Sequence, residues 1–164
     1  MIIYHPFQDA NHCLYRLLSI LYKNPCSINV DVISFMDFYY LIPSQLKNIQ
    51  NWPRKNSKNK AIVDSIQDSY EKIENPRRIF FELSDIRNNT LSHLIAKQIV
   101  TIKNNELHLD DKKLSSEFIC KLESDSFRHS SIFKIITQEM GKINTSGKTG
   151  LKIKTNLMEY RYDK

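Results

Sequence analysis

The chain has 164 residues, of which 41% are hydrophobic and 26% are charged, and its formal net charge at pH 7 is +6. This length suits one domain, and the apolar fraction is sufficient for a buried core, so wholesale disorder is excluded. Uncharged stretches such as 38–46 fall far short of the roughly 20 apolar residues that span a bilayer.

The first residues lack the basic region and the small-residue cleavage site of a secretory signal peptide. Three cysteines, Cys13, Cys26 and Cys120, form no CxxC motif, so we interpret them as small, buried apolar side chains rather than as metal ligands or a nucleophile. We therefore expect a soluble, cytoplasmic protein with no membrane segment.

Two helices are predicted in the first part of the chain. Asp9 is suited to cap the first, which should end near Asn24 and Pro25. Its apolar side chains recur at helical spacing: Leu14, Leu17, Leu18 and Leu21. A second helix is predicted over 30–41, followed by Pro43 and a short turn over 44–49.

The middle of the chain is predicted to hold an exposed loop and one helix. The loop covers 51–60, and the helix covers 61–74 with apolar residues three or four apart: Ile62, Ile66, Tyr70 and Ile73. Pro76 suits the first turn of the next helix.

Residues 77–109 predict a winged helix-turn-helix. We expect a short helix over 77–85, a turn over 87–89, a second helix over 90–99 and a hairpin that turns at Asn104 and Asn105. The hairpin register pairs Lys103 with Glu106 and places four apolar residues on one face: Val100, Ile102, Leu107 and Leu109. The second helix would expose few cations, which favours protein docking over reading of a DNA groove: Ser92, His93, Lys97 and Gln98.

Further helices are predicted over 115–122 and 130–140, and the chain is polar after Gly141. The predicted fold is therefore mainly α, a helical domain containing a winged helix-turn-helix with a small β-hairpin. This domain covers 1–141 and includes a basic loop at 47–60. A basic tail covers 142–164, where a late strand or a docking segment is suggested by Ile153, Leu157 and Tyr160.

The positive charge is concentrated in that loop and that tail. Residues 47–60 hold five basic side chains and no acidic one, and residues 142–164 hold six basic and two acidic ones. Such segments bind nucleic acid without sequence preference by releasing counterions, and Trp52 could stack on a base. The alternative is that they only keep the protein soluble. The nucleic-acid candidates are Lys47, Arg54, Lys55, Lys58, Lys60, Lys148, Lys152 and Lys154.

No residue pattern predicts catalysis. The Gly-Lys-Thr triplet at 147–149 lacks the spacing of a P-loop, and no predicted strand precedes it. The histidines lack the spacing of a zinc site: His5, His12, His93, His108 and His129. We therefore expect a protein that is not an enzyme and uses no metal or cofactor.

The N-terminus gathers polar residues around a helix start. Asp9 lies three residues before His12, which lies four before Arg16, so all three can share one helix face. One interpretation is a capped helix with a local hydrogen-bond network. The other is a surface that docks a partner and comprises His5, Pro6, Asp9, His12 and Arg16. These five residues resemble the opening of the small middle components of bacterial ABC-three-component systems.

This resemblance implies a small helical protein that lies between an SMC/Rad50-like ATPase and an effector, often a nuclease, as in Lamassu-type anti-phage and anti-plasmid defence. It implies no catalytic residues. We therefore expect a bridging subunit that restrains the effector, with non-specific DNA contact through the basic segments. The main alternative is a stand-alone winged-helix DNA-binding transcriptional regulator. A small hydrolase or nuclease that uses His5 or His12 is a third hypothesis.

Overall fold

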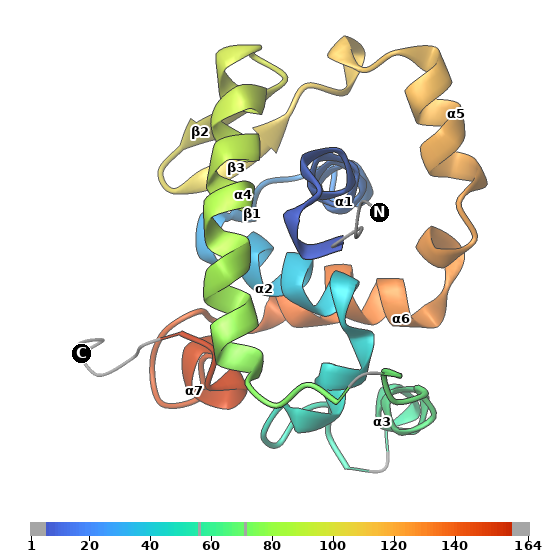
Figure 1. The fold of residues 1–164 in the computed structure, drawn as a ribbon, viewed down its shortest axis with the longest axis vertical. Helices are drawn as coiled ribbons and strands as arrows, with labels where there is room; N and C mark the ends of the chain where they lie inside the picture. Colours follow the sequence, from blue (N-terminus) through green and yellow to red (C-terminus); the bar gives the residue numbers. More distant parts are fainter. Residues whose placement is uncertain (1–5, 56, 71, 159–164) are drawn as a thin grey trace, which may run out of the picture.

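The computed structural model describes residues 6–55, 57–70 and 72–158, and it is mainly helical with one small sheet. A short turn, η1 (Pro6–Gln8), leads into the central helices, which are α1 (Ala10–Lys23), α2 (Val30–Leu41) and α4 (Pro76–Ala96). Figure 1 shows α4 running along one side of the molecule, with α1 seen nearly end-on beside it. The prediction of a mainly helical chain is confirmed.

The first two helices begin and end as predicted. The Asp9 carboxylate caps α1 by accepting from the backbone N–H groups of Asn11 at 2.8 Å and His12 at 3.1 Å. The side chain of Asn29 caps α2 in the same way, accepting from the N–H of Asp31 at 2.9 Å. Each cap satisfies backbone donors that the first turn of a helix leaves without partners.

The core is built on α2, which is buried on nearly every side. Phe35 and Phe38 of this helix both pack on Phe80 of α4, with ring centroids 5.4 and 5.8 Å apart. A helix that is apolar around its circumference is typical of a central position. One charged side chain, that of Asp37, is nevertheless fully buried within α2 and must be stabilised from neighbouring helices.

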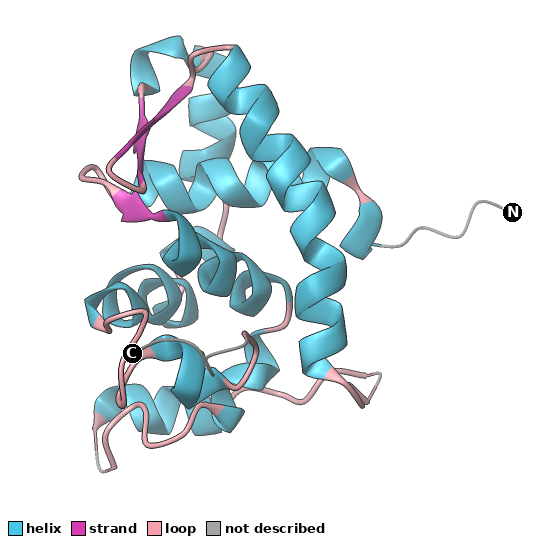
Figure 2. Cartoon of the chain, turned by 90° about the vertical axis from the view of Figure 1, so that its left-hand side faces the viewer, coloured by secondary structure: helices cyan, strands magenta, loops and turns pink. Residues whose placement is uncertain are grey.

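The sheet is a three-stranded antiparallel one with the order β1-β3-β2, formed by β1 (Ile28–Asn29), β2 (Val100–Lys103) and β3 (Glu106–Leu109). The β2–β3 hairpin has the predicted register, including Lys103 opposite Glu106. Asn104 and Asn105 have φ of 51° and 62°, as the predicted turn requires. Figure 2 shows the three strands gathered at one end of the molecule, where α4 ends. The strand β1 was not predicted.

The predicted turn at 87–89 is wrong, because α4 is one continuous helix through these residues. Arg87 points inward and is 3% exposed, while Asn88 and Asn89 lie on the exposed face of the helix. The helix ends instead at Ala96, followed by Lys97 as its C-cap and by Gln98 with φ of 56°. Residues 77–99 therefore do not supply both helices of a helix-turn-helix.

The helix predicted over 61–74 is also wrong in extent. After η2 (Pro43–Asn48), the helix α3 (Lys58–Asp64) begins inside the predicted loop and ends ten residues early. The Ser65 hydroxyl donates to the carbonyl of Ile62 at 2.7 Å, which is a local alternative to continuing the helix. Tyr70, one of the periodically spaced residues of the predicted helix, is fully exposed.

The C-terminal part packs around the central helices. The predicted helices are α5 (Ser116–Ser124) and α6 (Ser131–Lys134), the latter continuing as a π-helical turn over Ile135–Glu139. In place of a late strand, the chain forms the short helix α7 (Leu151–Thr155). Leu151 and Leu157 are buried in the core, so the segment is docked on its own chain as far as residue 158. Tyr160 lies outside the described residues. No helix within 6–55, 57–70 and 72–158 is long and apolar enough to cross a membrane.

Candidate functional site

A buried ionic cluster joins the three central helices. The carboxylate of Asp37 on α2 accepts from Arg16 of α1, at 2.7 Å from Nε and 3.4 Å from Nη2. Arg87 of α4 approaches the same carboxylate, with 3.5 Å between its Nη1 and Oδ2. Arg16 and Asp37 are fully buried, and Arg87 is 3% exposed. Asp37 therefore lies between two cations and connects α1, α2 and α4.

The cluster holds one carboxylate against two guanidinium groups, and the two arginines differ in how well they are compensated. Burial lowers the pKa of Arg16, but the charge and hydrogen bonds of Asp37 outweigh burial and raise it overall. For Arg87, burial lowers the pKa and Asp37 offsets this only in part. Its Nε and Nη1 make no hydrogen bond, and its guanidinium lies 5.3 Å from the ring centre of Phe80. Arg87 is the weaker partner.

Two further side chains of α1 belong to this cluster. Nη1 of Arg16 donates to Nδ1 of His12 at 2.9 Å, which joins the cluster to a half-buried histidine. Burial, and then the charge of Asp37, raise the pKa of the Cys13 thiol. A thiol with a raised pKa in a closed site is a poor nucleophile, so this environment suits a structural cysteine.

The structure places the predicted docking residues in different environments. Asp9 is the cap of α1, His12 is half-buried against Arg16, and Arg16 has no exposed surface for a partner. Pro6 begins η1, and His5 lies outside the described residues. The geometry therefore matches the interpretation of a capped helix with a local hydrogen-bond network.

Sequence analysis missed Asp37 and Arg87, although a signal for each was present. Asp37 is the only charge between residues 32 and 46, within an otherwise uncharged and mostly apolar segment. Arg87 lies four residues after Leu83 and four before Leu91, on the inward face of α4. A charge on an apolar face needs a buried partner, and the two residues supply one for each other.

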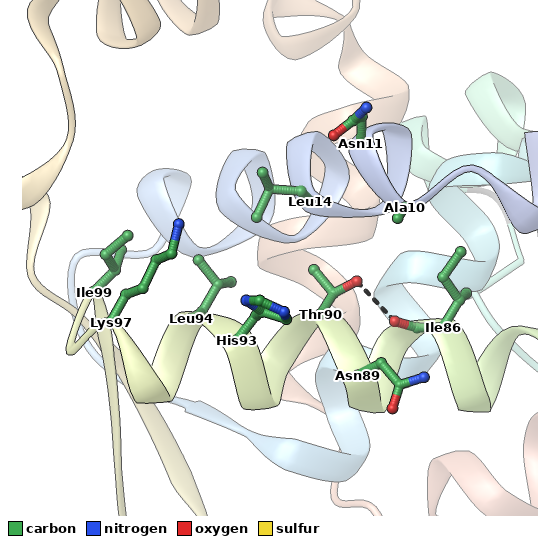
Figure 3. A pocket seen from close by; sticks show the side chains of 10 residues that line it. All are labelled: Ala10, Asn11, Leu14, Ile86, Asn89, Thr90, His93, Leu94, Lys97 and Ile99. Carbon is green, nitrogen blue, oxygen red and sulfur yellow. Dashed lines mark hydrogen bonds between the residues drawn. The ribbon is translucent and has the colours of Figure 1, made fainter.

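A groove of about 360 Å³ lies between α1 and the second half of α4 (Figure 3). Leu14 and Leu94 face one another across it, and Lys97 extends over one end. The Thr90 hydroxyl donates to the carbonyl of Ile86 at 2.7 Å, so it is occupied within the helix. The other lining residues are Ala10, Asn11, Asn89, His93 and Ile99. The groove is mainly apolar, and none of its lining residues is acidic.

The two basic segments, predicted separately, meet in the structure. The backbone N–H of Gln50 donates to the carbonyl of Lys154 at 2.9 Å, and Nζ of Lys154 lies 3.4 Å from the carbonyl of Gln50. The loop at 47–60 therefore lies against α7. Figure 1 shows both near the end of the molecule that carries α3.

Several of the predicted nucleic-acid residues are already in ion pairs. Lys47 lies 2.8 Å from Asp68, Lys60 lies 2.7 Å from Asp64, and Lys152 lies 3.9 Å from Asp31. Four other cations are exposed and form no ion pair within the described part of the chain: Arg54, Lys55, Lys58 and Lys148. These four keep the most charge available for a phosphate backbone.

Among the residues that the structure describes, no three histidine, cysteine or acidic side chains lie close enough together to hold a metal ion. Cys26 and Cys120 are exposed, in contrast to their predicted burial, and Cys13 is buried as predicted.

Residues 2–163 match the family described as ABC-three component (ABC-3C) system Middle Component 5. No curated protein and no solved structure matches the chain. The match covers almost the whole sequence, and it confirms the resemblance drawn from the N-terminal residues: the chain belongs to the Middle Component 5 family of ABC-three-component systems.

Proposed function

We propose that this protein is a non-catalytic bridging subunit of a Lamassu-type defence complex, linking an SMC/Rad50-like ATPase to a nuclease effector and restraining that effector. Membership of the middle-component family supports a role within a multi-subunit system. The observation that carries the proposal is the apolar groove between α1 and α4, because a groove lined by Leu14 and Leu94 is suited to a partner.

The occupant we propose is an amphipathic helix of a partner subunit. Its apolar side chains, three or four residues apart, would lie along the partly buried lining residues Leu14, Ile86 and Ile99, as in other helix-in-groove complexes. Its acidic side chains would lie near His93 and Lys97. None of the lining residues is acidic, so nothing in the groove would repel the acidic side chains of such a helix.

The order of the elements supports a winged-helix origin for the fold. Helix, strand and helix (α1, β1, α2) are followed by α4 and a hairpin, with the strand order β1-β3-β2 that is typical of winged helices. In this proposal α2 and α4 are the paired helices, and residues 42–75 are an insertion between them. The exposed face of the second half of α4 carries uncharged residues such as Asn88 and Ser92, which favours protein docking there, whereas its exposed arginines, Arg77 and Arg78, lie in the first turn.

The proposal is tested by purifying the complex through a tag on this chain, expressed together with its neighbouring genes. We expect a large assembly that contains an ATPase with a long coiled coil and an effector. Recovery of only one or two copies of the 19.4 kDa chain would contradict it and would favour the stand-alone regulator, which should be a symmetric dimer.

The groove is tested within the same complex. Leu14→Asp places a charge in the apolar lining, and Lys97→Glu reverses the charge at its end, so each variant should release one partner subunit. Lys112→Glu is a matched control, since Lys112 is exposed in the segment between β3 and α5. Retention of every partner by both groove variants, with unchanged unfolding temperatures, would exclude the groove as the docking site.

A further inference from the structure

A second hollow, of about 380 Å³, lies beside the basic loop and combines an aromatic ring with cations. It is lined by Trp52 and by three basic side chains, Arg54, Lys55 and Lys60, with Ile49, Asn51 and Pro53 completing its walls. Asn51 has φ of 53°, a left-handed conformation that turns the chain into the loop. Nothing in the bridging role described above uses this hollow.

Trp52 is held in place rather than free in solvent. Its side chain is half-buried and packs against the hydrophobic core while also lining the hollow. A ring fixed in this way loses little conformational freedom when a planar group stacks on it. Stacking of a nucleobase on an aromatic side chain contributes about 1–3 kcal/mol per base and tolerates any base.

The cations around the ring differ in availability. Arg54 and Lys55 are exposed and form no ion pair within the described part of the chain, whereas Lys60 shares its charge with Asp64 at 2.7 Å. Lys58 is exposed nearby, and Lys154 lies against Gln50 at the start of the loop. A phosphate attached to a base that is bound in the hollow would therefore contact Arg54 and Lys55 first.

We propose that this hollow binds a single-stranded nucleic acid, with one unpaired base on Trp52 and the neighbouring phosphates on Arg54 and Lys55. The volume is that of a small-ligand site, which admits a base but not a duplex. A free nucleotide offers the same base and phosphate chemistry as a strand. Several cations lie along the rim of the hollow, and they could contact successive phosphates, which favours a strand over a mononucleotide.

The chain offers a direct readout, because Trp52 is its only tryptophan. Titration of the full-length protein with an oligothymidylate of about a dozen nucleotides should quench the Trp52 emission. With two phosphates neutralised by Arg54 and Lys55 at about 0.7 each, the logarithm of affinity should fall with the logarithm of salt concentration at a slope of about −1.4. The matching duplex and thymidine monophosphate are the comparison ligands, and each should bind at least about tenfold more weakly than the oligothymidylate.

Variants separate stacking from charge. With a fluorescein-labelled strand, Trp52→Leu should weaken binding by about tenfold, and Trp52→Phe should retain part of the affinity. The double variant Arg54→Glu, Lys55→Glu should weaken binding and flatten the salt slope. The control Lys112→Glu, Lys121→Glu makes the same change in net charge on exposed residues near α5, at the other end of the molecule (Figure 1). It should retain most of the affinity.

The proposal would be overturned by absence of quenching, by a duplex or mononucleotide that binds as tightly as the strand, or by equal losses in the control and the Arg54/Lys55 variant. Arg54 and Lys55 are exposed, so their variant should fold even if a Trp52 variant does not. The measurement uses the chain without partner subunits, so failure of the bridging proposal would leave its outcome unaffected.

Discussion

Removing the charge of Asp37 should destabilise the protein more than any surface substitution. Asp37→Asn keeps the shape of the side chain but leaves Arg16 and Arg87 as two buried cations without an anion. Loss of one partner from a buried ion pair costs about 3–5 kcal/mol, because the remaining charge stays desolvated. That is a large part of the 5–15 kcal/mol typical of a domain.

The structure also predicts the order of the effects. Arg87→Met should cost less than Arg16→Met, because Arg87 approaches Asp37 at 3.5 Å and leaves two nitrogens without hydrogen bonds, whereas Arg16 donates at 2.7 Å. Replacing all three residues by apolar side chains (Arg16→Met, Asp37→Leu, Arg87→Met) should recover most of the stability lost in Asp37→Asn, since no unpaired charge remains.

Urea unfolding monitored by circular dichroism measures these differences, with the slope against urea concentration checked for each variant. Asp31→Asn is the control, because Asp31 is partly exposed and 3.9 Å from Lys152, and it should cost no more than about 1 kcal/mol. A loss below about 1 kcal/mol in Asp37→Asn would refute the reasoning, since it would mean that water reaches the cluster and screens its charges.

Three further predictions concern other parts of the chain. A thiol reagent should modify two cysteines of the native protein and a third only after unfolding, since Cys13 is buried while exposed thiols are provided by Cys26 and Cys120; rapid modification of all three would contradict this. Burial raises the pKa of Tyr40 to about 12, so the folded state holds this proton more tightly than the unfolded state, whose pKa is about 10. The contribution of Tyr40 to the free energy of unfolding is complete below pH 10 and should be lost between pH 10 and 12. Measurement of the free energy of unfolding against pH checks this, and a value that does not change over this range would contradict it. Gly150→Ala should destabilise the fold by about 1–3 kcal/mol in the same urea assay, because the added Cβ would lie 2.5 Å from the carbonyl oxygen of Ser146; an unchanged midpoint would show that the segment shifts freely.

Features set by neighbouring residues were predicted well. The Asp9 cap, the limits of α2 and the β2–β3 register all follow from short-range signals: a carboxylate before a leucine-rich periodic segment, a proline after an apolar one, and an Asn-Asn pair between alternating residues. Each signal acts over a few residues, so no knowledge of the rest of the fold was needed.

The errors arise where distant residues decide the structure. Asn88 and Asn89 are typical of a turn, yet α4 continues through them. In this helix Arg87 is buried against Asp37, which lies fifty positions earlier in the chain. The two-residue strand β1 exists only because Ile28 pairs with Leu107. Local propensity is weak compared with such tertiary contacts, so neither outcome was available from the sequence pattern.

The same long-range contacts explain why Arg16, one of the predicted docking residues, has no exposed surface. One face of α1 carries Arg16, which is bound to α2 and close to the Arg87 side chain of α4. A different face of α1 carries Leu14, two residues before Arg16, and Leu14 lines the groove against α4. Because Asp37 pairs with Arg16 of α1 and with Arg87 of α4, it helps to hold together the two helices that form the groove. Substitution of Arg16 should therefore weaken partner binding in proportion to lost stability. Leu14→Asp should weaken it by more than its loss of stability accounts for, because Leu14 is only partly buried against the core and also lines the groove. If partner binding fell in proportion to lost stability in both variants, the groove would not be the docking site.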